Sequence, residues 1–250
     1  MKKILLVGAS GGIGHEVARQ LLENGYEVFG TYFRHSERVE DLKHFDNFTA
    51  EHLDITDIDS VRKILSLHFE ERKPNLFAVI NCEGIIEFEG NGIEDDIQIW
   101  QKTIAINLSG NYYLAKIAHA YFQENGRFIM LSSTDSYFGG AITTSYAASK
   151  SGVNSLTKSL SLLFQDKKIR VNSIAPGWIV TPMIEGNGDE FLKKVAAINP
   201  LKRNGKPQDV ANLISFLLDE KSDYINGQVL SLEGGYTNQD PTLLLEERGQ

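Results

Sequence analysis

The sequence predicts an α/β fold in one domain: a doubly wound, mostly parallel sheet of seven strands with helices on both faces. Short apolar or β-branched runs alternate with longer segments of helical period almost from end to end, which is the pattern of βαβ units. Several of these runs are apolar throughout, as expected for strands covered on both sides. A chain of 250 residues is a length that one α/β domain can fill.

Each expected strand is an apolar or β-branched run bounded by turn residues. The seven runs are 3–7, 27–32, 48–53, 77–81, 127–131, 169–174 and 228–232. Helical patterns lie between them, clearest at 12–24, 58–71, 93–122, 145–164 and 207–218. Right-handed crossovers would place these helices on both faces of the sheet. We expect residues 1–238 to form the domain, with a substrate lid around 183–206, and residues 239–250 to form a C-terminal tail.

Composition excludes several partners. The 25 basic and 33 acidic residues give a formal charge of -8, and the basic residues form no block, which argues against nucleic acid. Cys82 is the only cysteine, so no intramolecular disulfide is possible and a reduced, cytoplasmic compartment is expected. The first apolar stretch, Ile4 to Val7, is too short for a signal or membrane segment. No metal site is predicted.

A glycine-rich turn follows the first expected strand directly. It reads Gly8-Ala9-Ser10-Gly11-Gly12-Ile13-Gly14, and a helical pattern starts within it. Glycines let the backbone approach a pyrophosphate, and the free N–H groups at the start of a helix attract the anion. The alternative is a plain turn, in which glycines also collect. The strand-to-helix context favours a dinucleotide site, with these expected contacts: Gly8, Ser10, Gly12, Ile13 and Gly14.

The end of the second expected strand indicates which dinucleotide is bound. Sites selective for NAD carry an acidic residue there to hold the ribose hydroxyls. In this chain no carboxylate appears until Glu37, whereas Arg34 offers a planar guanidinium that can pair with a 2'-phosphate. The sequence therefore favours NADP(H) over NAD(H). The alternative is that Arg34 is a solvated loop residue.

Tyr146 and Lys150 form the expected proton-donating pair. They are four residues apart in a helical segment and therefore share one face. A free tyrosine has a pKa near ~10, and an ammonium held close is expected to favour the phenolate. Such a tyrosine can protonate a carbonyl oxygen as a hydride arrives, or accept the proton in the reverse reaction. This spacing is also common by chance, so the surrounding residues decide its meaning.

Two polar residues upstream complete the expected catalytic set. Ser133 comes just after the strand 127–131, where a hydroxyl can hydrogen-bond the substrate oxygen. Ser132 and Thr134 have the same chemistry, so spacing decides between the three. Asn107 lies among apolar residues of a long helical segment, where a polar side chain needs a partner. Its alternative role is that of a satisfied buried amide.

These motifs together resemble the short-chain dehydrogenase/reductase family. The resemblance covers roughly residues 3–236 and includes two further landmarks, at 175–182 and 232–235. It implies a Rossmann-type fold in which Tyr146 is the general acid/base, Ser133 orients the substrate and Asn107 anchors a water. It also implies that Tyr146 and Lys150 hold the nicotinamide ribose. The other cofactor contacts that it implies are Asp54, Asn81, Gly84, Pro176, Gly177, Ile179 and Thr181.

The chain departs from the family pattern at two places. The family usually has Asn-Asn-Ala-Gly after the fourth strand, whereas this chain has Asn81-Cys82-Glu83-Gly84, which puts a carboxylate near the expected cofactor edge. The threonine that usually precedes the first glycine is Val7 here, so a side-chain bond to the neighbouring loop is missing. Both departures concern cofactor affinity more than cofactor class.

The resemblance implies an NADP(H)-dependent enzyme that reduces a ketone to a secondary alcohol, and the pattern is most similar to 3-oxoacyl-(acyl-carrier-protein) reductases. The substrate is then a small carbonyl or alcohol, or an acyl thioester. The alternatives are a sugar, polyol or small-alcohol dehydrogenase of the same family, or a catalytically silent nucleotide sensor. An epimerase or dehydratase would need a larger C-terminal region than the one that follows Thr181.

Substrate contacts and subunit contacts can be placed only coarsely from the sequence. Expected pocket residues are Ile86, Phe88, Tyr137 and Phe138, with ordinary core or surface aromatics as the alternative. An acidic carrier protein would need basic residues near the lid, which are present as Lys193, Lys194, Lys202, Arg203 and Lys206. The long helical segments 93–122 and 145–164 favour a homotetramer, or else a dimer. Leu243 to Leu245 in the tail would pack on a neighbouring subunit.

Overall fold

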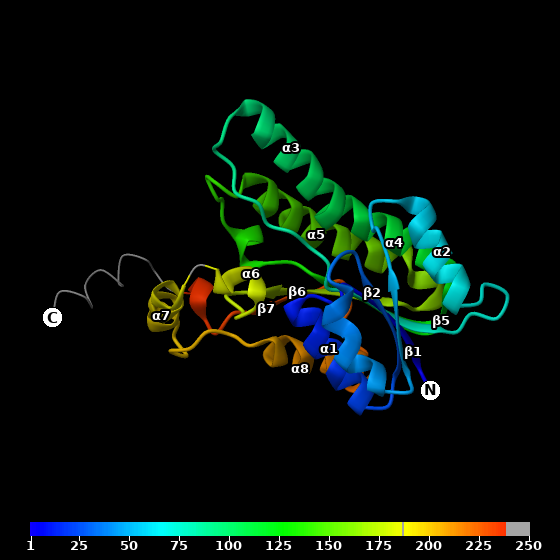
Figure 1. Cartoon of the computed structure of the whole chain (residues 1–250). Coiled ribbons are helices and arrows are strands. Elements are labelled where there is room, and N and C mark those ends of the chain that lie inside the picture. The colour runs from blue at the N-terminus through cyan, green and yellow to red at the C-terminus, as the bar shows by residue number, and fades with distance from the viewer. Residues whose placement is uncertain (187, 239–250) are drawn as a thin grey trace.

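The computed structural model describes residues 1–186 and 188–238 and contains a sheet of seven parallel strands with helices on both faces (Figure 1). The strand order β3-β2-β1-β4-β5-β6-β7 confirms the doubly wound α/β fold in one domain. The strands are β1 (Lys3–Val7), β2 (Glu27–Tyr32), β3 (Phe48–His52), β4 (Leu76–Asn81), β5 (Phe122–Leu131), β6 (Arg170–Pro176) and β7 (Val229–Leu232).

The helices form a layer on each side of the sheet. The α-helices are α1 (Gly12–Glu23), α2 (Ile58–His68), α3 (Ile93–Ile104), α4 (Gly110–Ala118), α5 (Thr144–Leu163), α6 (Pro182–Glu185), α7 (Asp189–Ile198) and α8 (Pro207–Leu218). Figure 1 shows α1 and α8 on one face and α2, α4 and α5 on the other. The short helices α6 and α7 lie at the end of the sheet away from the N-terminus, near the carboxyl ends of the strands (Figure 1).

Short helical turns connect several of these elements. They are η1 (Ser36–His44), η2 (Ala105–Ser109), η3 (His119–Tyr121), η4 (Thr134–Tyr137), η5 (Gln165–Lys167), η6 (Glu220–Ser222) and η7 (Tyr236–Asn238). All are 3₁₀ turns except η2, which is a π-helical turn. Single π turns inside longer helices often lie at functional sites.

Strand β1 shows why the central strands are apolar throughout. Ile4 and Leu6 belong to the core beneath α1 and α8, whereas Leu5 and Val7 belong to the core beneath α2, α4 and α5. All four side chains are essentially inaccessible to solvent. Because successive side chains of a strand point to opposite faces, a strand covered on both sides must be apolar at every position.

Two predicted boundaries were wrong, around the segment expected as one helix over 93–122. Helix α3 ends at Ile104, the π turn η2 follows, and α4 ends at Ala118. Strand β5 begins at Phe122 rather than at residue 127, because Phe122 pairs with Leu76 before a register shift. The polar run 123–126 hides this early start, since it has no apolar alternation.

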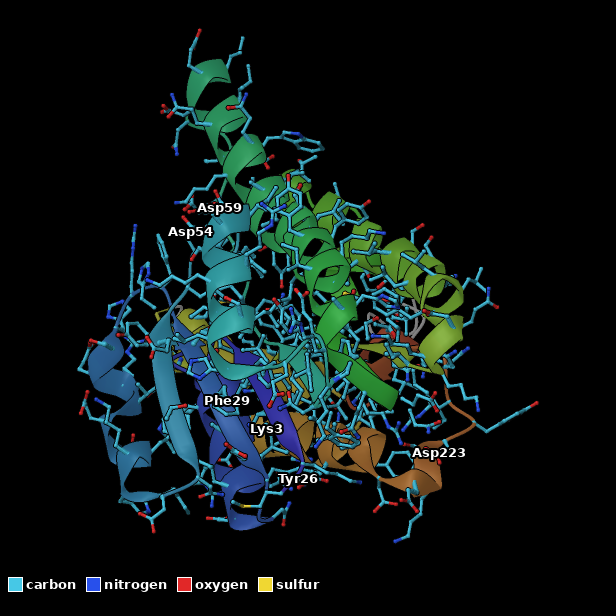
Figure 2. The ribbon with its side chains drawn as sticks, turned by 90° about the vertical axis from the view of Figure 1, so that its right-hand side faces the viewer. Lys3, Tyr26, Phe29, Asp54, Asp59 and Asp223 are labelled. Atoms are coloured by element: carbon cyan, nitrogen blue, oxygen red, sulfur yellow. The ribbon has the colours of Figure 1, made fainter. Side chains whose placement is uncertain are left out.

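The two edges of the sheet differ in what they offer to ligands. Figure 2 shows Lys3 and Tyr26 toward one edge and Asp54 toward the other. At the amino edge the buried Arg127 and Arg170 both reach Asp223, with N···O distances of 2.7 and 3.4 Å. These two ion pairs connect β5 and β6 to the segment before β7. The carboxyl edge, where ligands bind in such sheets, is left open.

The sequence predicts no membrane segment and a C-terminal tail. Within residues 1–186 and 188–238, every helix is too short or too polar to span a bilayer. The tail expected at 239–250, with its leucine run, lies outside the described residues.

Candidate active site

The strand order brings two loops together at the carboxyl edge. The order reverses between β1 and β4, so the glycine turn after Val7 and the loop after Asn81 are neighbours. The Cys82 N–H donates to the carbonyl of Val7 at 2.9 Å, and the Gly8 N–H donates to the Thr31 hydroxyl at 3.3 Å. The first bond connects the two neighbouring segments and the second connects the glycine turn to β2, although Val7 replaces the usual threonine.

The glycine turn is too tight for side chains at two positions. A Cβ on Gly14 would overlap the carbonyl oxygen of Gly8 and lie 2.9 Å from its carbonyl carbon. A Cβ on Gly12 would lie 2.9 Å from the Cβ of Thr181, in the segment that leads into α6. Glycine therefore allows both the turn itself and its contact with the lid segment.

A groove of about 510 Å³ runs along this turn. It contains these predicted cofactor residues: Gly8, Ser10, Gly12, Ile13, Gly14, Arg34, Gly84 and Thr181. Arg34 lies at its edge, where the Ser10 hydroxyl donates to its carbonyl at 3.2 Å. Arg38 lines the groove as well, and was not predicted. Among the described residues neither guanidinium takes part in a salt bridge, so both are available to an anion.

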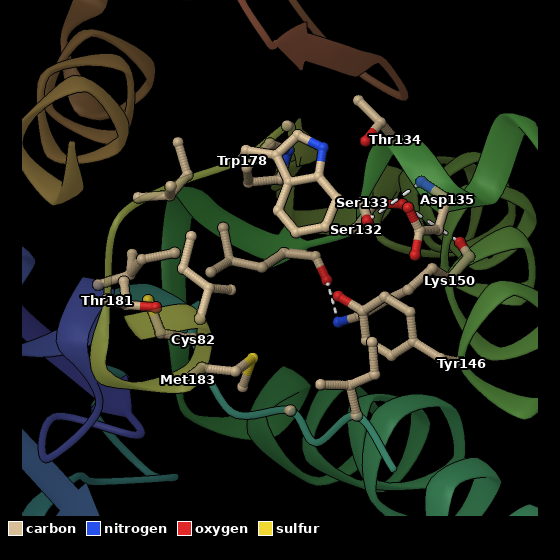
Figure 3. A pocket seen from close by; sticks show the side chains of 18 of the residues that line it. Cys82, Ser132, Ser133, Thr134, Asp135, Tyr146, Lys150, Trp178, Thr181 and Met183 are labelled. Atoms are coloured by element: carbon tan, nitrogen blue, oxygen red, sulfur yellow. Dashed lines mark hydrogen bonds between the residues drawn. The ribbon is translucent and has the colours of Figure 1, made fainter. Parts of the chain in front are cut away.

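A second cavity, of about 170 Å³, holds the predicted catalytic side chains Ser133, Tyr146 and Lys150 (Figure 3). It also contains the predicted cofactor residues Pro176, Gly177 and Ile179. The groove and the cavity share a set of lining residues: Ile13, Cys82, Glu83, Gly84, Thr181 and Met183. The two spaces therefore form one continuous site, with the glycine turn at one end and the tyrosine at the other.

Helix α5 places Tyr146 and Lys150 on the cavity wall. Tyr146 lies in its first turn and Lys150 one turn later. The main-chain N–H of Ser145 donates to a carboxylate oxygen of Glu89 at 2.7 Å, which fixes the start of the helix. The Lys150 ammonium lies 5.6 Å from the centroid of the Tyr146 ring and donates to the carbonyl of Leu131 at 2.9 Å.

The pKa of Tyr146 differs in direction from the sequence-based expectation. Burial raises the pKa of Tyr146 to about 12, a hydrogen bond with Ser133 opposes that rise, and the charge of Asp135 adds to it. Lys150 does not lower the pKa here, because its ammonium is directed at the Leu131 carbonyl rather than at the phenol. Tyr146 is therefore protonated at neutral pH, which is the form that can donate a proton.

Lys150 is itself perturbed. Burial lowers the pKa of its ammonium to about 8, and the neighbouring Cys82 and Glu83 oppose that shift. Lys150 is thus mostly charged at neutral pH, but its pKa lies only slightly above that pH. Glu83, which replaces the usual alanine, helps to keep it charged.

The structure distinguishes Ser133 from the hydroxyls beside it. The Ser132 hydroxyl is committed to helix α5, where it donates to Asn154 at 2.6 Å and reaches the carbonyl of Lys150 at 3.2 Å. The Ser133 hydroxyl accepts from the Asp135 N–H at 3.1 Å, and its own proton is directed to Tyr146 on the cavity wall. Ser132 and Thr134 line the cavity as well, so the choice of Ser133 stays a prediction.

The π turn η2 positions Asn107. Its amide donates to the carbonyl of Ile85 at 2.8 Å and accepts from the N–H of the same residue at 2.9 Å. A Cβ on Gly84 would lie 3.2 Å from the Lys150 ammonium and 3.4 Å from the Asn107 oxygen. Asn107 is therefore a fully buried, satisfied amide that holds the loop after β4 beside Lys150.

Two predicted cofactor residues direct their side chains away from the groove and the cavity. The Asn81 amide donates to Asn111 at 2.8 Å and accepts from the N–H of Glu83 at 2.9 Å. The Asp54 carboxylate accepts from the N–H and the hydroxyl of Thr56, at 2.9 and 2.6 Å. Both side chains shape the loops around the site, and neither lines it among the described residues.

The predicted substrate contacts were mostly wrong. Ile86 lines the cavity, but Phe88, Tyr137 and Phe138 do not, and these three are about half exposed. Their loops turn them toward solvent, a direction that aromatic character alone does not reveal. The basic lid residues are partly neutralised, since Lys194 pairs with Glu190 and Arg203 pairs with Asp209.

Sequence reasoning missed two lining residues, Asp135 and Trp178. Met183, which also lines the cavity, is the first residue of the predicted lid. Asp135 comes two residues after Ser133, and Trp178 directly follows the landmark glycine Gly177. The available signal was therefore their adjacency to predicted site residues. Loops carry no hydrophobic period that shows which side chains point inward.

Known proteins resemble this chain over nearly its whole length. A family model described as enoyl-(acyl carrier protein) reductase matches residues 8–237. The 3-oxoacyl-(acyl-carrier-protein) reductase FabG of Staphylococcus aureus strain Mu50 is 32% identical over 242 residues, which cover 94% of this chain and 97% of the relative.

Solved structures agree with the sequence relatives. Ligand-free aldohexose dehydrogenase of Thermoplasma acidophilum has a TM-score of 0.85 at 25% identity, covering 96% of this chain and 95% of its own. ElxO with NADP bound has a TM-score of 0.81 at 29% identity, covering 95% and 99%. Together with the matching family model, these likenesses show that the chain belongs to the short-chain dehydrogenase/reductase family and is an oxidoreductase.

Proposed function

We propose that this protein is an NADP(H)-dependent oxidoreductase that reduces a ketone to a secondary alcohol, with Tyr146 as the general acid. The observation that carries the proposal is the continuity of the site. Ser133, Tyr146 and Lys150 share a cavity that opens into the groove along the glycine turn. A silent nucleotide sensor has no need of these three side chains at the end of a cofactor groove.

In the proposed mechanism each residue has a separate task. The Ser133 hydroxyl donates to the substrate carbonyl oxygen, and the protonated Tyr146 transfers its proton to that oxygen as negative charge develops. Lys150 supplies a positive charge behind the tyrosine. Asn107 is a positioning residue that holds the backbone at Ile85, and its role in anchoring a proton-relay water stays a proposal.

The groove fits a dinucleotide phosphate. The glycine turn leaves no room for side chains, so its backbone can approach a diphosphate, and helix α1 starts at Gly12. Arg34 and Arg38 line the same groove and offer the cations that a 2'-phosphate would need. NADPH bound there would supply the hydride. The similar structure of ElxO with NADP bound supports this cofactor class.

Arg34→Asp is expected to weaken NADPH binding at least tenfold while changing the Kd for NADH by less than about threefold. A hydrogen-bonded ion pair with phosphate contributes about 1.5–3 kcal/mol, and 1.4 kcal/mol corresponds to a factor of ten. Fluorescence titration of both cofactors measures the effect. The matched control is Arg62→Asp on α2, which leaves the groove untouched. Equal losses for NADPH and NADH would remove Arg34 from the 2'-phosphate site.

Glu83 adds a carboxylate to the same groove. One of its oxygens would lie 3.1 Å from a Cβ on Gly8, directly beside the glycine turn. Burial raises the pKa of Glu83, the charge of Asp54 raises it further, and Lys150 opposes both. When ionised, this carboxylate repels a diphosphate held by the turn.

Glu83→Gln is therefore expected to tighten NADPH binding, by about three- to tenfold at pH 8. The raised pKa sets the sign of the pH dependence: protonation removes the repulsion, so wild type and variant converge as the pH falls. Kd values measured between pH 5 and 9 report this convergence. A constant ratio across the range, or weaker binding by the variant, would contradict the repulsion.

The similar proteins support two substrate classes. Likeness to the FabG reductase supports a 3-oxoacyl thioester, and likeness to aldohexose dehydrogenase supports a sugar or polyol. We assign the segment 183–206 as the substrate lid, because Met183 and Ile184 line the cavity. A panel of ketones that includes a 3-oxoacyl thioester, assayed with NADPH and NADH, tests reaction and cofactor together. We also propose a homo-oligomer, since Ile97 and Trp100 on α3 are exposed.

A further inference from the structure

Asp135 is a carboxylate on the cavity wall to which the proposed mechanism gives no task. It lines the same cavity as Ser133, Tyr146 and Trp178, and Figure 3 shows it beside Ser133 and close to the ring of Tyr146. Its main chain is fixed, because its N–H donates to the Ser133 hydroxyl at 3.1 Å and its carbonyl accepts from the N–H of Phe138 at 3.3 Å. The side chain is therefore held at the reacting end of the site.

The carboxylate of Asp135 has no partner within the described protein. Among the described residues no hydrogen bond or salt bridge reaches its oxygens, although the side chain is partly buried. Burial raises the pKa of Asp135, and no neighbouring cation opposes that shift. A partly buried acceptor without a partner is costly, so such a group usually marks a place where a ligand or water donates.

The other residues that line the cavity indicate what kind of hydrogen-bond donor would bind the Asp135 carboxylate. Many of the other side chains that line the cavity are apolar, with Ile86, Trp178 and Met183 among them. Among the residues that the structure describes, the charged groups facing the cavity besides Asp135 are Lys150 and Glu83, and Lys150 already supplies a cation. A neutral hydroxyl can donate to the Asp135 carboxylate without bringing a second positive charge close to Lys150.

From this placement we infer that Asp135 is a specificity-determining residue that accepts a hydrogen bond from a substrate hydroxyl next to the reacting carbon. The inference rests on the proposed ketone reduction and names its substrate class: a hydroxyketone and the corresponding vicinal diol, as found in polyols and sugars. A plain acyl chain offers no donor at this position and would leave the carboxylate unsatisfied. A site built to bind a hydroxyl rejects analogues that lack it more strongly than an apolar pocket rejects an added group.

Three ketones of nearly equal size test the inference: hydroxyacetone, butanone and aminoacetone, each with NADPH. The wild-type protein is expected to reduce hydroxyacetone with a kcat/KM at least tenfold above that for butanone. Asp135→Leu is expected to abolish this preference, by lowering the kcat/KM for hydroxyacetone at least tenfold more than that for butanone. Asp135→Asn, which retains an acceptor but not the charge, is expected to fall between the two.

Several outcomes would overturn the inference, and they are distinguishable from failure of the proposed function. Reduction of all three ketones without preference, or equal losses for hydroxyacetone and butanone in Asp135→Leu, would show that the carboxylate does not select a hydroxyl. A preference for aminoacetone would assign the site to a cation instead. Absence of any ketone reduction by wild type with NADPH would refute the proposed function itself. Thermal melting and the Kd for NADPH establish that the variants fold and load cofactor.

Discussion

Replacing Tyr146 with phenylalanine is expected to lower kcat for ketone reduction by about 10²-fold or more, with the Kd for NADPH changed by less than about threefold. The substitution removes one oxygen and leaves the ring, which is the part that packs beside Lys150. Because the pKa of Tyr146 is raised to about 12, the wild-type phenol carries its proton throughout the neutral range. The loss in the variant therefore reports the missing donor rather than a shifted titration.

The measurement is steady-state reduction of a ketone, followed by NADPH absorbance, together with fluorescence titration of the cofactor. Tyr137→Phe is the matched control, since Tyr137 lies nearby in sequence but is about half exposed and bonds to Ser231 at 3.1 Å. We expect near-normal activity in that control. Near-normal activity in Tyr146→Phe as well would remove Tyr146 from the role of proton donor.

The sequence could predict the sheet because the buried strands leave an unambiguous pattern. Strands β1 (Lys3–Val7) and β2 (Glu27–Tyr32) match their predicted ranges, and both are covered by helices on each face. The early start of β5 at Phe122 could not be predicted, because its pairing with Leu76 depends on a register shift in the neighbouring strand. Pairing between distant strands leaves no local signal.

In the candidate site, too, local motifs could be predicted and contacts between distant residues could not. The glycine turn and the pair Tyr146 and Lys150 are local motifs, so their placement at one edge followed from the sheet topology. The partners that set their chemistry are distant in the chain. Only the three-dimensional structure shows that the Lys150 ammonium donates to the Leu131 carbonyl. It also shows that the carboxylate of Glu83 lies beside Gly8. For this reason the direction of the Tyr146 pKa was predicted wrongly, although the residue itself was located.

The π turn is a further case where tertiary structure overrides the local pattern. The apolar period over 93–122 predicts one continuous helix, yet the helix opens at η2 around Asn107. The opened turn leaves the Asn107 side chain free to bond the backbone of Ile85, and the carbonyl of Asn107 accepts from Asn111 at 2.7 Å. A buried asparagine in an apolar helical stretch was the only signal in the sequence.

Gly14→Ala is expected to have the second large effect, because the added methyl group meets backbone rather than a side chain that could move. The Cβ would overlap the Gly8 carbonyl oxygen, which already accepts from the Gly11 N–H at 3.0 Å. The turn must open to relieve this overlap, and overpacking of this kind costs about 1–3 kcal/mol. In a chain of this size each kcal/mol lowers Tm by roughly 2–4 °C.

Opening the turn also moves the N–H groups that face the diphosphate, so the Kd for NADPH is expected to rise at least tenfold. Thermal melting with and without NADPH measures both effects, since a cofactor that binds only the folded protein raises Tm according to its concentration relative to Kd. Gly139→Ala is the matched control, because no atom of the described residues lies within 4 Å of a Cβ there. If Gly14→Ala melted at the wild-type temperature and gained the same increase from NADPH, the turn would not be the diphosphate site. A lowered Tm with an unchanged increase would confine Gly14 to a structural role and transfer phosphate binding to other parts of the groove.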